Sequence, residues 1–175
     1  VALWLVSVRL RDASIVDPFW GPGFAVIAWT SVAVAGPSPR GLLLAALASA
    51  WGLRLGAHLF LRWRGHGEDR RYQAMRAAHG ESFRWVSLFT VFLLQAALMW
   101  LVSLPLQAGA ALGRERPLGL LEGVGAAVFV IGRVFEAVAD AQLSRFFAGP
   151  ASRGRVMDRG LWSWTRHPNY FGDFL

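Results

Sequence analysis

Residues 160–174 hold the densest group of chemistry-bearing side chains in the chain. Aromatic residues alternate there with polar and ionisable residues, among them Arg166, His167, Asn169, Tyr170 and Asp173. A solvated loop needs few aromatic residues, and a plain entry into a membrane needs few hydrogen-bonding groups. The combination favours a pocket at a membrane surface that holds a large, polar, anionic molecule.

A second polar group recurs at helical spacing further upstream. Arg133, Glu136, Asp140 and Ser144 follow one another at intervals of three and four residues, which places them on one face of a helix. Charges inside a membrane span are costly and commonly face a cavity or the interior of a bundle. This face could form a site. Alternatively, Arg133 and Glu136 could simply neutralise each other, which would leave Asp140 without a partner in its own helix.

Two further stretches have side chains that suit phosphate or ribose. Residues 67–73 place two acids beside two arginines and Tyr72, which could form a salt-bridge network or could approach a ribose hydroxyl or a phosphate. Guanidinium groups that bind phosphate in a bidentate manner come later, on Arg153, Arg155 and Arg159. Pro168 predicts a helix start, where free N–H groups favour an anion, although proline is also ordinary at the start of a span.

The composition indicates an integral membrane protein. Hydrophobic residues make up 55% of the chain and charged residues 17%, against about 25% charged in an average soluble domain. We expect an all-α, polytopic transmembrane bundle that forms a single domain over residues 1–175, with about five to six spans. These spans are predicted at residues 1–10, 19–35, 41–61, 85–106 and 118–143, with a sixth beginning near residue 169. Because apolar runs are interrupted at residues 1 and 175, we expect a fragment truncated at both ends.

The arginines indicate how the chain is oriented. The net charge of +7 comes entirely from arginine, because the sequence contains no lysine. If the spans alternate, most arginines fall on one side, and the other side receives only Arg40, Arg114 and Arg116. Cytoplasmic loops carry such an excess, so we expect the polar stretches 62–84 and 144–168 to be cytoplasmic, in a membrane such as the bacterial inner membrane. The same rule accounts for the basicity without a nucleic-acid partner.

Several other classes of site are excluded or disfavoured. The chain has no cysteine, so disulfides, thiolate metal sites and cysteine nucleophiles are excluded. The four histidines lack the spacing of a metal site, and we expect no metal. There is no glycine-rich loop after a predicted strand and no Walker loop, so a soluble nucleotide-binding fold is not supported.

Five blocks of residues resemble the DUF1295 family, which belongs with the steroid 5-alpha-reductase-like membrane proteins. These blocks are SIVDPFWG at 14–21, WGLRL at 51–55, GEDxRYQ at 67–73, FEAxADxQL at 135–143 and GLWxxTRHPNYFG at 160–172. The resemblance runs along almost the whole chain. Distant relatives include sterol reductases, with a similar terminal motif, and the isoprenylcysteine carboxyl methyltransferases.

The resemblance implies a bundle of roughly seven helices that binds NADPH from its cytoplasmic side. It also implies hydride transfer to an activated C=C bond of a lipid-soluble, steroid- or enone-like substrate. The family positions that contact the cofactor match Glu136, Asp140, Arg155, Arg166, His167, Asn169, Tyr170 and Asp173. Steroid reductases use a tyrosine where this chain has Trp51, and tryptophan cannot donate a proton to a substrate. The candidates for the donor are therefore Asp17, Glu68 and Tyr72.

Two other functions remain open from the sequence. The first is an isoprenylcysteine-type methyltransferase that uses S-adenosylmethionine, whose sulfonium group does not need the extra arginines that suit a 2′-phosphate. The second is a non-enzymatic membrane protein that binds lipid or acts as a scaffold. The oligomeric state is not indicated by any feature of the sequence.

Overall fold

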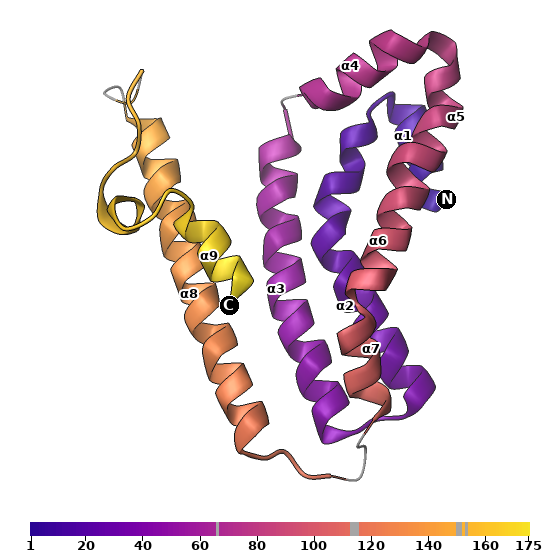
Figure 1. The fold of residues 1–175 in the computed structure, drawn as a ribbon. Coiled ribbons are helices and arrows are strands. Elements are labelled where there is room, and N and C mark those ends of the chain that lie inside the picture. The colour runs from indigo at the N-terminus through magenta and orange to yellow at the C-terminus, as the bar shows by residue number, and fades with distance from the viewer. Residues whose placement is uncertain (66, 113–115, 150–151, 153) are drawn as a thin grey trace. The chain divides into compact units, whose positions relative to one another are not determined.

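The computed structural model describes residues 1–65, 67–112, 116–149, 152 and 154–175, and every regular element among them is helical. The prediction of an all-α chain is therefore confirmed for these residues. Contacts divide the chain into two compact units, Val1–Pro117 and Leu118–Leu175, each of which is described by itself. Figure 1 shows the helices of both units.

The first unit consists of long apolar helices joined by shorter elements. In chain order these are α1 (Ala2–Leu10), the 3₁₀ turn η1 (Ala13–Ile15), α2 (Val16–Ala35), α3 (Pro39–Trp63), α4 (Arg70–His79), η2 (Gly80–Ser82), α5 (Phe83–Ser87), the π-helix η3 (Leu88–Leu93), α6 (Leu94–Val102) and α7 (Leu104–Ala111). Helix α2 packs against α3 and α7, and α3 also contacts α7. Helix α4 lies across one end of the unit, as Figure 1 shows.

Local chemistry accounts for several helix boundaries. The Ser38 hydroxyl accepts a hydrogen bond from the Gly41 N–H at 3.1 Å, and Pro39 occupies the first turn of α3, where its missing N–H costs nothing. Gly36 has a φ of 88°, which fits the predicted turn at residues 36–39. Ser103 separates α6 from α7, and Pro105 lies in the first turn of α7. The predicted fourth span at 85–106 is thus interrupted at Ser103.

Helix α4 was not expected from the pattern of the sequence. It lies inside the polar stretch 62–84, where its residues have few apolar side chains with which to form a stripe. The start of α4 is specified by Asp69, whose side chain caps the helix by accepting the Arg71 N–H at 2.9 Å. The Asp69 cap and the strong helix formers that follow it, three alanines with Gln73, Met75 and Arg76 among them, were the local signals for this helix.

Helices α2 and α3 approach each other closely enough that their backbones touch. A Cβ atom built on Gly21 would lie 2.3 Å from the Gly52 carbonyl oxygen, and one on Gly52 would lie 2.2 Å from the Gly21 oxygen. One turn further along, a Cβ on Gly56 would lie 2.6 Å from the Pro22 ring. Membrane helices commonly pack through such small residues, because lipid supplies no hydrophobic force that would drive them together.

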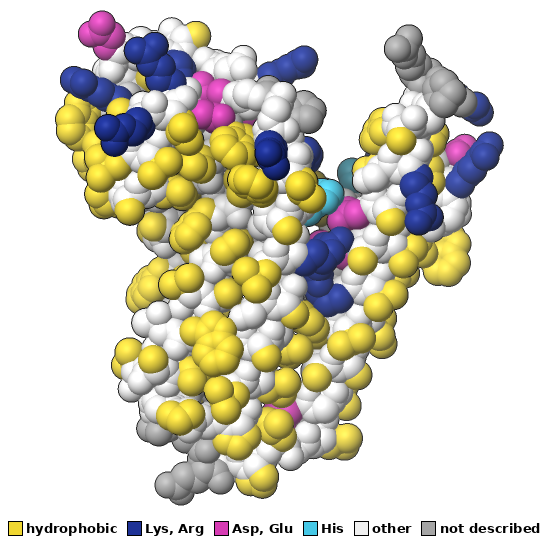
Figure 2. All heavy atoms as spheres, turned by 180° about the vertical axis from the view of Figure 1, so that it is seen from behind, with side chains coloured by type: hydrophobic (Ala, Val, Ile, Leu, Met, Phe, Trp, Pro, Cys, Tyr) yellow, Lys and Arg dark blue, Asp and Glu magenta, His cyan; other side chains and the backbone are white. Residues whose placement is uncertain are grey.

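Within the part of the chain that the structure describes, three helical segments are long and apolar enough to cross a membrane: Ala13–Ala35, Pro39–Trp63 and Arg70–Val102. They support the prediction of a membrane protein, and the count of five to six spans stays a prediction. Large hydrophobic side chains such as Val26, Leu53 and Leu98 are exposed on these helices, as expected for surfaces that face lipid. Figure 2 shows hydrophobic side chains spread over the long helices of the first unit and charged side chains gathered at its α4 end.

The second unit contains one long helix and a short one packed against it. Its elements are α8 (Leu120–Ala148), the 3₁₀ turn η5 (Gly160–Ser163) and α9 (Pro168–Phe174). The start of α9 agrees with the predicted helix start at Pro168. A Cβ on Gly172 would lie 2.6 Å from the Gly132 carbonyl oxygen, so a second pair of glycines allows α8 and α9 to touch.

Replacement of Gly52 by alanine is expected to destabilise the protein by about 1–3 kcal/mol, because the added methyl overlaps the Gly21 carbonyl and forces α2 and α3 apart. The measurement is the thermal unfolding midpoint of the purified protein in detergent. Gly125→Ala in α8 is the control, because a Cβ there meets nothing within 4 Å and alanine favours the helix. Equal midpoints for Gly52→Ala and the wild type would contradict the close approach.

Candidate functional site

The polar end of the first unit is organised by contacts between the η1 turn and the segment that precedes α4. The Ala13 N–H donates to Glu68 Oε1 at 2.8 Å, and the Asp69 N–H donates to the Ser14 hydroxyl at 2.7 Å. The Trp63 indole N–H donates to Asp12 Oδ2 at 2.8 Å. These bonds fix the position at which α4 begins relative to the start of α2.

Glu68 is fully engaged in this framework. Its side chain is 9% exposed, and it accepts two hydrogen bonds from the Arg76 guanidinium, at 2.9 Å from Nε and 2.7 Å from Nη2. With the bond from Ala13, both carboxylate oxygens have partners. Because both oxygens are occupied by groups of the fold, the geometry gives Glu68 a structural role.

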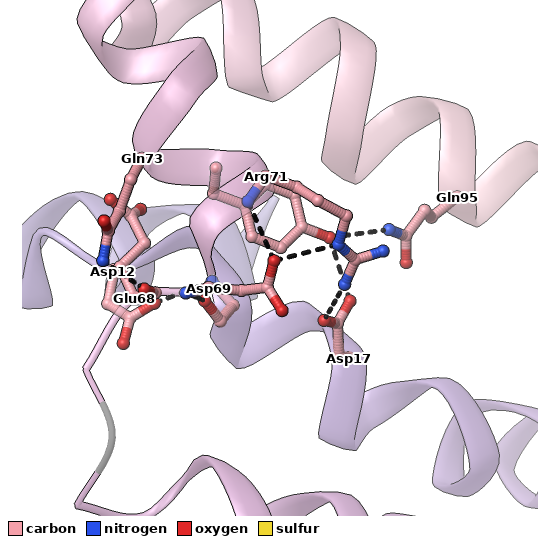
Figure 3. A network of polar contacts seen from close by, with 9 residues as sticks. Asp12, Asp17, Glu68, Asp69, Arg71, Gln73 and Gln95 are labelled. Atoms are coloured by element: carbon pink, nitrogen blue, oxygen red, sulfur yellow. Dashed lines mark hydrogen bonds and ion pairs between the residues drawn. The ribbon is translucent and has the colours of Figure 1, made fainter. Parts of the chain in front are cut away.

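Asp17 and Tyr72 form a direct contact between α2 and α4. Tyr72 is buried, and its hydroxyl donates to Asp17 Oδ1 at 2.9 Å. Arg71 Nη2 binds the other oxygen of Asp17 at 3.0 Å, and Gln95 Nε2 lies 3.4 Å from the Tyr72 hydroxyl. Figure 3 shows Asp17 facing Arg71, with Gln95 approaching from another helix.

Arg71 joins the acids at this end into one network. Its Nε binds Asp69 Oδ1 at 2.9 Å, while its Nη2 holds Asp17. The hydrogen bonds from the side chain and backbone N–H of Arg71 hold the pKa of the Asp69 carboxyl below its usual range. Asp69 is therefore ionised at neutral pH and keeps the guanidinium of Arg71 directed toward Asp17.

Two hollows meet at Asp17. One has a volume of about 590 Å³ and is lined by polar residues around the α4 start, including Ser14, Glu68 and Asp69. The other, of about 350 Å³, is lined by Asp17, Trp20, Leu59, Arg62, Arg71 and Gln95. Asp17 and Arg62 line both hollows. Volumes in this range suit small-molecule ligands.

Of the three predicted proton donors, the structure brings Asp17 and Tyr72 into contact and commits Glu68 to Arg76. Sequence reasoning included Arg71 in the possible salt-bridge network of residues 67–73, but it did not single out Gln95. A signal for Gln95 was present, because it is an isolated amide in an apolar segment. It follows directly on the π-helix η3 and Leu94. π-helical turns within α-helices frequently occur at functional sites.

In the second unit, the charged face of α8 meets α9. Asn169 Nδ2 donates to Asp140 Oδ1 at 3.3 Å, so α9 supplies a partner for Asp140. Glu136 is 5% exposed and forms an ion pair with Arg133 one turn earlier. The carbonyl oxygen of the Asn169 side chain is buried and accepts no hydrogen bond from the described residues.

The first half of the terminal motif has a structural role. The Leu161 N–H donates to Gln142 Oε1 at 3.0 Å, and the Trp162 indole N–H donates to the Ala139 carbonyl at 3.0 Å. Gly160 has a φ of 61° and lies against the Gln142 side chain, where a Cβ would approach within 2.6 Å. These contacts fasten η5 to α8 and thereby orient the chain that leads into α9.

The remaining predicted cofactor residues fall into two groups. Arg155 lines a cavity of about 370 Å³ beyond the end of α8, together with Phe146, Asp158 and Arg159. Exposed side chains surround the start of α9, namely Arg166, His167, Tyr170 and Asp173. The rings of His167 and Tyr170 pack with their centroids 5.3 Å apart. Arg153 lies outside the described residues.

No group of three potential metal ligands lies within reach of a common ion in the described part of the chain, and His66 is outside that part.

The family "Protein of unknown function (DUF1295)" matches residues 3–175. The chain belongs to the DUF1295 family. No curated protein and no solved structure gave a significant match. The family assignment therefore carries no activity, and the geometry above is the basis for a functional proposal.

Replacement of Glu68 by alanine is expected to lower the free energy of unfolding by about 2 kcal/mol, because Arg76 and the Ala13 N–H lose their acceptor. The loss is smaller than for a fully buried pair because Arg76 remains partly exposed. Unfolding by heat or denaturant measures the change. Glu81→Ala is the matched control, since Glu81 is an exposed acid on the same end of the unit. Loss of stability in both variants alike would contradict a specific role for Glu68.

Proposed function

We propose that this chain is a membrane-embedded reductase that uses NADPH to reduce a C=C bond conjugated to a carbonyl in a lipid-soluble substrate. The observation that carries the proposal is the Asp17–Tyr72 pair. A buried phenol is held by a carboxylate, beside hollows at the end of helices whose outer surfaces suit lipid. An apolar substrate could reach such a site from the membrane.

The chemistry requires a donor at the carbonyl oxygen of the substrate. Bound NADPH would supply a hydride to the carbon β to this carbonyl, and electron density would then move onto the oxygen. In the proposed mechanism the buried Tyr72 hydroxyl, which donates to Asp17 beside the hollows, exchanges that acceptor for the substrate oxygen, and Gln95, which lines the smaller hollow, offers a second donor. Asp17 orients the phenol, and Arg71 fixes Asp17 in turn. Solvent would supply the proton that the α carbon finally gains.

The second unit has groups that suit a nucleotide. Arg155 and Arg159 line one cavity, and paired guanidinium groups are the donors that a phosphate ester requires. The buried Asn169 carbonyl oxygen, which has no donor among the described residues, is suited to an amide or ribose hydroxyl. We assign cofactor binding to Arg155 and Asn169, with Glu136, Asp140, Arg166, His167, Tyr170 and Asp173 as the further members of the set.

We also propose a membrane topology for the chain and a place for it in a wider family. We infer that α8 is a further span, whose charges face protein rather than lipid, which brings the count toward the predicted five to six. The arginine-rich ends would face the cytoplasm, in a membrane such as the bacterial inner membrane. Placement among the steroid 5-alpha-reductase-like proteins is part of the same proposal and is supported by the terminal motif.

Addition of NADPH is expected to raise the unfolding midpoint of the detergent-solubilised protein, and Arg155→Ala or Asn169→Ala should abolish this shift. The measurement compares NADPH, NADH and S-adenosylmethionine by thermal shift. Arg145→Ala is the matched control, because Arg145 is a nearby arginine in the last turn of α8 that does not line the Arg155 cavity.

The three ligands separate the rival functions. A shift with S-adenosylmethionine instead of NADPH would move the protein to the methyltransferases. Stabilisation by none of them would favour a non-enzymatic membrane protein and would overturn the reductase proposal.

Tyr72→Phe is expected to lower the kcat for reduction of a lipid-soluble enone by about 10²-fold or more, with little change in cofactor binding, because only the donor hydroxyl is lost. The fall in NADPH absorbance as the cofactor is oxidised measures the rate. Ser31→Ala is the control, since it also removes one hydroxyl, which bonds only the Ile27 carbonyl within α2. Unchanged kcat in Tyr72→Phe would remove Tyr72 from the mechanism.

A further inference from the structure

The first unit contains a second polar cavity that shares no lining residue with the hollows at Asp17. Its volume is about 740 Å³, and it lies between the end of α1 and the turn from α4 into α5. The residues that line it are Ser7, Val8, Arg11, Ala13, Arg76, Gly80, Glu81, Phe83, Arg84 and Ser87. Nothing in the proposed reductase chemistry uses this cavity.

Positive charge predominates in the lining. Arg76 is already paired with Glu68, and its guanidinium also lies 4.5 Å from the centre of the Phe83 ring. Arg11 and Arg84 are exposed and have no ion-pair partner among the described residues. Glu81 is the one acid that lines the cavity. Two guanidinium groups are therefore available to an anion that enters here.

The position of Arg11 is unusual for an arginine. Its φ of 54° is the only positive value at a non-glycine residue in the described part of the chain. This left-handed conformation ends α1, where glycine would be the unstrained choice. The backbone strain persists even though the side chain makes no ion pair within the protein. An arginine at such a position favours a use for the side chain outside the fold.

Aromatic residues place the cavity at the level of lipid headgroups. Trp4 and Trp85 pack with their ring centroids 5.4 Å apart, and the Trp4 indole N–H donates to the Arg84 carbonyl at 2.8 Å. The Arg84 guanidinium lies 5.7 Å from the centre of the Trp85 ring. Tryptophan is enriched at the membrane–water interface, so a cavity beside this pair lies where phosphate groups of lipids are found.

We propose that this cavity binds the phosphate group of an anionic phospholipid, with Arg11 and Arg84 as its ligands. Basic pockets at the cytoplasmic ends of membrane helices recognise anionic headgroups in this way. The seryl hydroxyls of Ser7 and Ser87 bond to carbonyls of their own helices, so the two arginines provide the recognition. Glu81 opposes the anion and limits its affinity.

The test is native mass spectrometry of the whole chain in detergent, titrated with phosphatidylglycerol and with phosphatidylcholine. The wild type is expected to retain phosphatidylglycerol in preference. The double variant Arg11→Gln/Arg84→Gln should bind it about tenfold more weakly or worse, because it loses two charges near the phosphate. Glu81→Gln should bind it several-fold more tightly, which is a gain that misfolding cannot mimic. Arg9→Gln is the matched control, because Arg9 lies in the last turn of α1 but does not line the cavity.

Three results would overturn the proposal. The double variant could bind phosphatidylglycerol as well as the wild type does. Arg9→Gln could lose as much affinity as the double variant, which would mean that general surface charge is responsible. Millimolar inorganic phosphate could occupy the site while phosphatidylglycerol shows no preference over phosphatidylcholine, which would identify a soluble anion as the ligand. None of these readouts depends on the reductase activity.

Discussion

Contact between glycine backbones is the constraint on which both units depend. At Gly21 and Gly52 in the first unit, and at Gly132 and Gly172 in the second, there is no room for even a methyl group. Such proximity maximises dispersion contacts between helices whose other faces are apolar and would gain nothing by leaving lipid. The spacing also sets where the polar residues lie. Asp17 is one turn from Gly21 on α2, and Glu136 is one turn from Gly132 on α8, so each glycine contact fixes the depth of a functional candidate.

The polar end of the first unit shows how acids of similar appearance acquire different roles. Asp12 and Glu68 bind groups of the fold itself, an indole and a backbone N–H, and stabilise the start of α4. Asp17 instead binds Tyr72 and Arg71 beside two hollows. Asp12 and Glu68 hold the start of α4, and α4 carries the Tyr72 and Arg71 side chains that bind Asp17. Loss of Glu68 would therefore also disturb the Asp17 site. Activity measurements on Glu68 variants therefore need stability measurements beside them.

The sequence predicted the elements that depend on local composition. Long apolar runs located α2 and α3, and Pro168 marked a helix start that the structure confirms. The short amphiphilic helix α4 was missed, because its stability comes from a cap and from tertiary contacts rather than from an apolar stripe. The Asp17–Tyr72 contact joins residues 55 positions apart, which no local pattern reveals. Glu68 was a candidate proton donor by its residue type, but its contacts with Arg76 and the Ala13 N–H give it a structural role.

The π-helix Leu88–Leu93 gives the chain a sensitivity to length that hydropathy does not reveal. A wider turn of this kind holds one residue more than the α-helical path would, and each added or removed residue rotates everything beyond it by about 100°. Gln95 faces Tyr72 only in the present register. A single-residue deletion among Leu88–Leu93 would remove the extra residue and return the segment to the α-helical path, whereas a deletion in the preceding helix α5 would turn Gln95 toward a different neighbour. Natural selection on this segment would thus act on its residue count as strongly as on its composition.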